Sequence, residues 1–446
     1  MKKKILITIL TVFLIFSLCG CDVITFNVID LMSPPKATGE KAAIQKLIDT
    51  EAGADYSLKY PQSGSYRSAI TTVDYDSDGV EEAIAFYLPA GEAQTIHLLI
   101  MDNIDGEWTT VGNHISKSTA VDRLLFTDLD SDGTSEIIVG WSTYNNLVKD
   151  LSLYMTSSGI SSEIICESQY SELICSDFTG SGKEELLLLS LYTADKPASA
   201  TLITLNDTKN SLYTISEAPI DGDVVSFAKI QTGRVFYGQQ GAVVDGVTAN
   251  GANSTPTYKT QLIYYSDYFA SLQVVSFAGD TPTNQKERNY AVLSEDIDSD
   301  GIIEIPNTFK LRIDDIQTEA IPAALIYWCE YNAMGTMDIN KTQVTSLVYS
   351  LRFTIPEKWG DNYTAYVNYS TNEITFYEWT NGKPGDAILI IRMFAPEAFD
   401  DGVSAKGYTE LARNDNYVYS FITPGLNSKM MLTNEEIAKA FTLTTK

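Results

Sequence analysis

The chain has 446 residues and a formal net charge of −27, because 58 acidic residues outnumber 31 basic ones. With 44% hydrophobic and 11% aromatic residues it can bury a sizeable core, which excludes wholesale intrinsic disorder. The acidic excess argues against nucleic acid and against an anionic membrane surface as partners, since binding to either relies on clustered lysine and arginine.

The N-terminal residues predict export and lipid attachment. Three lysines precede an apolar run from Ile5 to Leu18, which is typical of a secretory signal and short for a membrane-spanning helix of about 20 residues. The sequence LCGC that ends at Cys21 resembles the lipobox of bacterial lipoproteins. The resemblance implies that residues 1–20 are removed and that Cys21 carries a lipid on the extracytoplasmic face of the cell membrane. The alternative is a simple N-terminal anchor with incidental cysteines.

Residues 21–53 are expected to form a tether and a short helix. The tether includes Ser33-Pro34-Pro35, and the segment GEKAAIQKLIDTEAG over residues 39–53 has helical periodicity. Its predicted apolar face consists of Ala43, Ile44, Leu47 and Ile48.

Three nine-residue segments then repeat one chemical pattern: DYDSDGVEE from Asp74, DLDSDGTSE from Asp128 and DIDSDGIIE from Asp296. Carboxylates at positions 1, 3 and 5 of a tight loop converge on one point, and they repel each other unless a hard cation such as Ca²⁺ lies between them. Glycine at position six permits a positive φ. The carbonyl of position seven and the glutamate at position nine would complete the shell. The predicted ligands are Asp74, Asp76, Asp78, Val80, Glu82, Asp128, Asp130, Asp132, Thr134, Glu136, Asp296, Asp298, Asp300, Ile302 and Glu304.

A fourth segment, DFTGSGKEE from Asp177, keeps the first aspartate, the glycine and the glutamate. Thr179 and Ser181 replace two carboxylates there, so an empty or weak site is expected. None of the copies fits an EF-hand, which needs a bidentate glutamate at position 12 and flanking helices. Apolar runs typical of buried strands follow the loops instead.

These loops resemble the DxDxDG repeats of integrin-α-type propellers, the FG-GAP or VCBS family. The resemblance covers about residues 66–350 and implies three Ca²⁺ sites, one for each complete copy. The glutamate at position nine departs from the aspartate that is more usual in the family, so direct and indirect roles for it both stay open. The other interpretation of the loops is acidic turns without metal.

The spacing of the loops predicts a mainly β fold, a β-propeller over residues 54–350. Units of about 50 residues with four strand-like runs are typical of propeller blades. A hidden turn at Lys229–Arg234 would bring the count to five blades, with six as the alternative. The strand Ser68–Asp74 is expected to close the ring by pairing with the last blade.

Residues 351–446 are predicted to form a small α+β domain with a mainly antiparallel sheet. Thr371-Asn372 is expected to form a hairpin turn, and Thr433 with Glu436 a capping box ahead of a helix.

The cysteines and histidines give weaker signals. Cys166 and Cys175 flank a predicted hairpin centred on Tyr170 and Ser171, which would bring them within disulfide reach; two buried thiols are the alternative. His97 and His114, the two histidines of the chain, are expected to be packed rather than catalytic.

The sequence therefore predicts a non-catalytic binding or scaffold lipoprotein that recognises a protein or a glycan of the cell envelope. The alternative is an exported polysaccharide lyase or hydrolase with its site in the propeller channel. Paired acids facing an arginine or tyrosine in that channel would favour the enzyme.

Overall fold

The computed structural model describes residues 39–444, apart from 54, 93, 144–146, 158–159, 167, 207, 209–210, 249–254, 312–319, 403–404 and 425–428. The predicted signal peptide, Cys21 and the tether therefore lie outside the described residues. Within the described part, no helix combines the length and the apolar character needed to cross a membrane.

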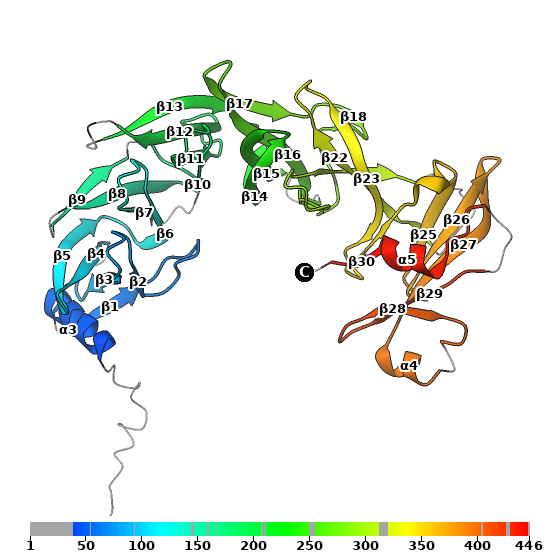
Figure 1. The fold of residues 1–446 in the computed structure, drawn as a ribbon, viewed down its shortest axis with the longest axis horizontal. Coiled ribbons are helices and arrows are strands. Elements are labelled where there is room, and N and C mark those ends of the chain that lie inside the picture. Colours follow the sequence, from blue (N-terminus) through cyan, green and yellow to red (C-terminus); the bar gives the residue numbers. More distant parts are fainter. Residues whose placement is uncertain are drawn as a thin grey trace, which may run out of the picture.

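Five antiparallel sheets follow one another along an open arc (Figure 1). The first contains β1 (Tyr56–Lys59), β2 (Ile70–Val73), β3 (Glu82–Pro89), β4 (Ile96–Ile104) and β5 (Glu107–Ser116). The second contains β6 (Ala120–Thr127), β7 (Glu136–Ser142), β8 (Lys149–Ser157) and β9 (Ile160–Ile165). The third contains β10 (Glu172–Ser176), β11 (Glu185–Ser190), β12 (Ser199–Leu205) and β13 (Leu212–Pro219).

The fourth sheet contains β14 (Val224–Phe236), β15 (Gln239–Thr248), β16 (Thr257–Ser266) and β17 (Ser271–Ser276). The fifth contains β20 (Ile305–Lys310), β22 (Ala324–Tyr331), β23 (Met337–Ser346), β24 (Leu351–Thr354) and β30 (Phe441–Leu443). A small hairpin of β18 (Asp280–Thr281) and β19 (Asn284–Gln285) lies between them in sequence. The prediction of a mainly β chain built from successive sheets of about four strands is confirmed.

Neighbouring sheets stack through shared apolar cores. Phe86 of the first sheet meets Trp141 of the second with ring centroids 5.8 Å apart, and both belong to one buried cluster. Similar clusters join the second sheet to the third, the third to the fourth and the fourth to the fifth. Because a central strand is covered on both faces, its sequence is a continuous apolar run, as in EIIVGWS of β7, which is buried throughout.

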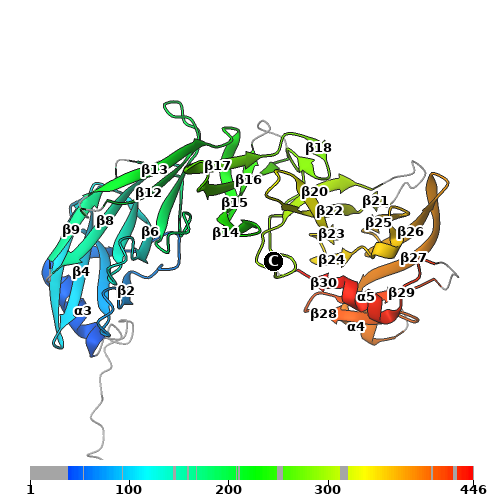
Figure 2. The ribbon, with the colours of Figure 1, turned by 45° about the horizontal axis from the view of Figure 1, so that its top comes forward.

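The ring is not closed. β2 pairs with β3 of its own sheet, and the first and fifth sheets lie at separate parts of the arc (Figures 1 and 2). The predicted pairing of Ser68–Asp74 with the last blade is therefore wrong. The hidden turn at Lys229–Arg234 is also wrong, because these residues lie inside β14; the chain turns at Tyr237-Gly238, where glycine has a φ of 77°.

Helix α3 (Glu40–Ala52) covers the outer side of the first sheet. Ile44 and Ile48 are buried against Ala83, Ala85 and other apolar side chains of that sheet. The predicted helix is confirmed. Its buried apolar face is narrower than expected, because Ala43 is exposed and Leu47 is only half-buried.

A sixth sheet follows the arc at its C-terminal end. It contains β21 (Ile321–Pro322), β25 (Tyr363–Asn368), β26 (Glu373–Thr380), β27 (Lys383–Phe394), β28 (Thr409–Arg413) and β29 (Val418–Ile422). The 3₁₀ helix η1 (Glu357–Trp359) and helices α4 (Pro396–Asp400) and α5 (Asn434–Ala440) accompany it. The Thr433–Glu436 capping box is present at the start of α5. The hairpin between β25 and β26 turns through Asn372, whose φ is 54°.

The fifth and sixth sheets share one core. β24 and β30 come from residues predicted as a separate domain, yet they complete the fifth sheet beside β23. One buried cluster contains Leu325 and Val344 before residue 351 and Phe353, Phe376 and Ile437 after it. The expected division between residues 350 and 351 thus falls inside a sheet and a core.

We expect Phe353→Ala to lower the free energy of unfolding by about 3–5 kcal/mol, because it empties a fully buried aromatic position of this shared core. Phe269→Ala, at a side chain that is 63% exposed, is the matched control. Chemical denaturation followed by pulse proteolysis should show the fifth and sixth sheets losing stability together. If only the fragment after residue 351 became susceptible, the shared core would be refuted.

Candidate metal centres

The first acidic loop joins β2 to β3, and its aspartates hold its backbone in a tight turn. Asp74 Oδ2 accepts a hydrogen bond from the Gly79 N–H at 3.1 Å, and Asp78 Oδ1 accepts one from the Val80 N–H at 2.7 Å. Asp76 Oδ1 accepts from the Asp78 N–H at 3.2 Å. The side chains are thereby oriented towards one point before any ion binds.

The second and third complete loops repeat this geometry. Gly133 and Gly301 donate to the first aspartate of their own loops, both at 2.9 Å. The predicted positive φ at position six is confirmed in all three loops, with values of 90°, 94° and 88°. Position four also has a positive φ in each, at Ser77, Ser131 and Ser299. A sequence signal for this backbone conformation is Gly180, which occupies position four in the fourth copy.

The glutamate at position nine has a structural role that the sequence did not reveal. In all four copies it is buried, and one of its oxygens accepts a hydrogen bond from the backbone N–H of position two in the same loop. The donor–acceptor distance is 2.9 Å for Tyr75 to Glu82 and 2.7 Å for Leu129 to Glu136. This bond ties the start of the loop to the strand that follows it.

Three groups of carboxylates come close enough to hold a metal ion. In the first and third loops, one oxygen from each of the three aspartates and the glutamate lies within 4.8 Å of the others. In the second loop the three aspartates converge in this way without Glu136. The predicted ligands therefore come together, except for Glu136. The carbonyl groups of Val80, Thr134 and Ile302 stay predicted ligands.

The first loop passes a direct test of fit for a cation. Glu82 is fully buried and contributes one carboxylate oxygen to the converging cluster. Its second oxygen, Oε1, has no hydrogen-bond partner among the described residues. A buried carboxylate oxygen without a partner is costly. Burial, together with the charges of Asp76, Asp102 and Asp74, raises the pKa of Glu82 to about 7. A divalent cation would satisfy this oxygen and neutralise the repulsion.

The fourth loop satisfies its own glutamate instead. Thr179 and Ser181, which replace the two missing carboxylates, both direct their hydroxyl groups to Glu185 Oε1. Hydrogen bonds thus take the place that a cation would have in the other loops. This arrangement explains why a threonine and a serine can occupy these positions without loss of the turn.

The two histidines each lie within hydrogen-bond distance of neighbouring side chains. His97 lies between Glu92 and Asn113, at 3.2 and 3.3 Å, and His114 Nε2 is 2.7 Å from Ser161 Oγ. Burial lowers the pKa of His114. Cys329 is fully buried in the core that the fourth and fifth sheets share.

No disulfide joins Cys166 to Cys175. The hairpin that would have paired them is wrong, because β9 ends the second sheet and β10 begins the third. Cys175 instead contacts Thr127 and Glu184, and burial raises the pKa of its thiol to about 12.

A buried ionic cluster connects the second sheet to the third. Lys149 Nζ is 2.9 Å from Asp122, and the Tyr170 hydroxyl donates to the same carboxylate at 2.8 Å. Arg123 pairs with Glu172 at 2.8 Å and borders a cavity of about 490 Å³ beside β6, β10 and β14. The cluster thus contains the acids, the arginine and the tyrosine that would favour an enzyme. However, Asp122 bonds to Lys149 and Tyr170, and Arg123 pairs with Glu172, so these side chains link the second sheet to the third.

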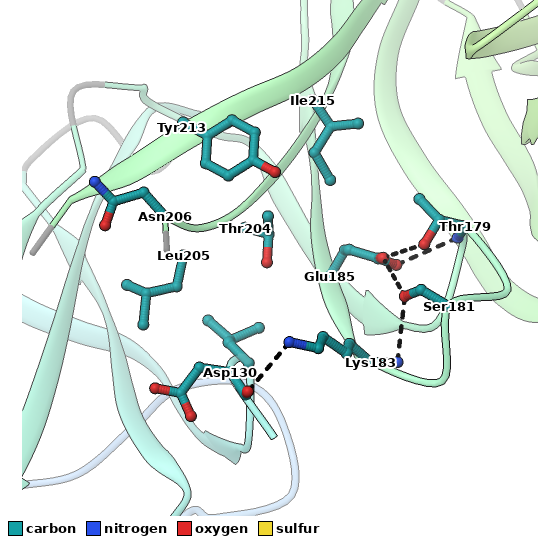
Figure 3. A pocket seen from close by; sticks show the side chains of 11 residues that line it. Asp130, Thr179, Ser181, Lys183, Glu185, Thr204, Leu205, Asn206, Tyr213 and Ile215 are labelled. Atoms are coloured by element: carbon teal, nitrogen blue, oxygen red, sulfur yellow. Dashed lines mark hydrogen bonds between the residues drawn. The ribbon is translucent and has the colours of Figure 1, made fainter. Parts of the chain in front are cut away.

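A second pocket, of about 410 Å³, lies between the second and fourth loops (Figure 3). Tyr213 and Thr204 border it on one side, and Lys183 reaches across to the main-chain oxygen of Asp130 at 3.2 Å. Glu185 and Asn206 add a carboxylate and an amide. The pocket therefore combines one aromatic ring with hydrogen-bonding groups of several kinds.

No family model and no curated protein matches this chain. Solved structures with local similarity include a Lactobacillus plantarum protein with 8% identity and a TM-score of 0.28, covering 72% of this chain and 84% of that one. Sqt1 of Saccharomyces cerevisiae has 10% identity and a TM-score of 0.27, covering 69% and 72%. A candidate 6-phosphogluconolactonase from Bacteroides fragilis has 12% identity and a TM-score of 0.21, covering 67% and 91%. These scores are too low to support an argument about fold or function.

The raised pKa of the loop glutamates predicts how the metal-free protein responds to pH. A glutamate of ordinary pKa 4.5 in the unfolded chain and about 7 in the folded one holds its proton more tightly when folded. Its contribution to stability is therefore complete below pH 4.5 and lost as the pH rises through 7. In a chelator, the melting temperature should fall between pH 5 and 7 more steeply for the wild type than for Glu82→Gln, which does not titrate. Equal slopes would contradict this account.

Proposed function

We propose that the chain is an extracytoplasmic lipoprotein, anchored through Cys21, that uses calcium-stabilised repeats of the FG-GAP or VCBS type to bind a partner without catalysis. The anchor is supported by the apolar leader and the lipobox-like LCGC. The repeats are supported by loops that share one hydrogen-bonding pattern and lead directly into buried strands. The protein is expected to act as a rigid binding or scaffold component of the cell envelope.

The observation that carries the metal is Glu82 Oε1, a buried carboxylate oxygen without a partner in a group of four acids. Such a set of hard oxygen donors suits Ca²⁺, which accepts six to eight oxygens in flexible geometry, better than Mg²⁺, which sheds its water reluctantly. When bound, the cation supplies only charge neutralisation and order, and we assign it no chemical step. The side chains that would hold it are Asp74, Asp76, Asp78 and Glu82; Asp128, Asp130 and Asp132; and Asp296, Asp298, Asp300 and Glu304.

Of the two partners expected from the sequence, the pocket beside the second loop favours a glycan. Tyr213 is 49% exposed and offers an aromatic face for a sugar ring. Thr204 and Asn206 add a hydroxyl and an amide group to the same pocket, which suit a neutral ligand rich in hydroxyl groups. The pocket adjoins Asp130, so calcium in the second loop would also order one of its walls.

We expect calorimetry with calcium to find three bound ions per chain, with millimolar calcium needed for saturation if the sites resemble extracellular modules. Each occupied site should stabilise the fold by about 2.7 kcal/mol at a calcium concentration of 100 Kd. Asp130→Ala should remove one ion, and Asp177→Ala, in the loop closed by hydroxyls, should remove none. No bound calcium at any concentration up to about 5 mM would refute the metal assignment.

The binding role is tested with an array of cell-envelope glycans and the calcium-loaded protein. We expect retention of at least one glycan class, and a loss of about two- to tenfold in affinity for Tyr213→Ala, since an aromatic contact is worth about 0.5–1.5 kcal/mol. Tyr237→Ala, at a tyrosine that is 86% exposed on the fourth sheet, is the matched control. Retention of a protein from the same envelope, unaffected by Tyr213→Ala, would favour a protein partner elsewhere. Depolymerisation of the glycan would favour the enzyme.

A further inference from the structure

A position outside the DxDxDG motif distinguishes the loops from one another. Adjacent antiparallel strands place directly opposed side chains about 4.5–5.5 Å apart at Cβ. β3 and β4 pair Ala83 with Met101, so one residue further along Glu82 faces Asp102. β20 and β22 pair Ile305 with Cys329, so Glu304 likewise faces Glu330.

The same position carries no charge in the other two loops. β7 and β8 pair Ile137 with Tyr154, which places Met155 opposite Glu136. In the fourth loop, the pairing of Leu186 with Ile203 places Thr204 opposite Glu185. A fifth carboxylate is therefore available to the first and third loops, whereas the second loop has a thioether at the equivalent position.

We propose that Asp102 and Glu330 are additional cation-binding residues of the first and third loops, so that these two sites bind calcium more tightly than the second. The proposal rests on the calcium-binding function proposed above and extends it to residues that the motif does not contain. Affinity of calcium loops is set in large part by the number of charged ligands and the rigidity of the site.

At the first loop, Asp102 lies on the strand next to a carboxylate cluster in which one oxygen has no hydrogen-bond partner among the described residues. Glu82 is fully buried and its Oε1 is without a hydrogen bond. The pairing of Ala83 with Met101 sets Asp102 on the neighbouring strand directly beside this glutamate. Asp102 is therefore placed by the strand register beside the group formed by Glu82 and the three aspartates of the loop.

At the third loop, the side-chain amide of Asn340 lies among three carboxylate groups. Its amide nitrogen lies 2.9 Å from Asp298 Oδ2 and 2.8 Å from Glu304 Oε1, and it also contacts Glu330 Oε1. An amide nitrogen has two hydrogens, so it cannot satisfy three carboxylate oxygens. An asparagine can present its carbonyl oxygen instead of its nitrogen to the same point, which makes Asn340 a further ligand for a cation there.

The test is a competition titration of the full chain with calcium against a chromophoric chelator, which resolves the sites by affinity. We expect two tight sites and one weaker site in the wild type. Asp102→Asn and Glu330→Gln keep the side-chain shape and remove the charge, so each should weaken one tight site by about tenfold, which is about 1.4 kcal/mol. Met155→Asp should tighten the weak site by a similar factor.

Thermal unfolding separates a cation-binding role from a merely structural one. In chelator, Asp102→Asn should match or exceed the wild type in melting temperature, because it relieves repulsion in the empty loop. With calcium, the same variant should melt below the wild type. Three calcium sites of unchanged affinity in Asp102→Asn and Glu330→Gln would overturn this proposal and leave the proposed function intact. A wild type that binds no calcium would overturn both.

Discussion

Four buried glutamates, one in each acidic loop, are the constraint on which the loops and their sheets depend. Each uses one oxygen to hold the backbone N–H of loop position two, which fixes the loop to the strand that follows. The remaining oxygen must also be satisfied, because a buried carboxylate oxygen without a partner is costly. Three of the copies differ in the partner of this oxygen: Glu185 Oε1 accepts from two hydroxyl groups, Glu304 Oε1 shares the Asn340 amide with Asp298 and Glu330, and Glu82 Oε1 has no hydrogen-bond partner among the described residues. A cation would relieve the unpaired oxygen of Glu82 and the carboxylates crowded around Asn340, whereas the hydroxyl groups of the fourth loop leave no such need.

The open arc raises a second physical problem, since a stack of sheets that does not close leaves two apolar faces without a neighbour. At the N-terminal end, α3 buries Ile44 and Ile48 against the first sheet. At the other end, the sixth sheet shares a core with the fifth. Helix α3 and the sixth sheet therefore act as caps, as terminal units do in linear repeat proteins. They explain why each end of the array carries extra structure of a different kind.

The sequence predicted local features well because their signals lie within a few residues. The Asp–Gly loops, the helix after Gly39 and the Thr433 capping box all depend on neighbours in the chain. Features that depend on distant pairing were predicted poorly. The prediction of a closed ring required Ser68–Asp74 to pair with the last sheet, but this segment pairs within the first sheet. Lys229–Arg234 was predicted to be a turn, although it lies inside a long strand. Cys166 and Cys175 resembled a hairpin because the passage from one sheet to the next also joins two short strands. The approach of Asn340 to the third loop depends on an irregularity in the register between β22 and β23, which no local pattern reveals.

Hydrogen exchange of backbone amides, with and without calcium, tests the central claim most directly, because the fourth loop is an internal control within the same molecule. The account predicts that calcium slows exchange at residues 74–82, 128–136 and 296–304 and at the first residues of β3, β7 and β20. It predicts no change at residues 177–185 or in β11, where hydroxyl groups already satisfy the buried glutamate. Equal protection of all four loops, or no protection of any, would contradict it.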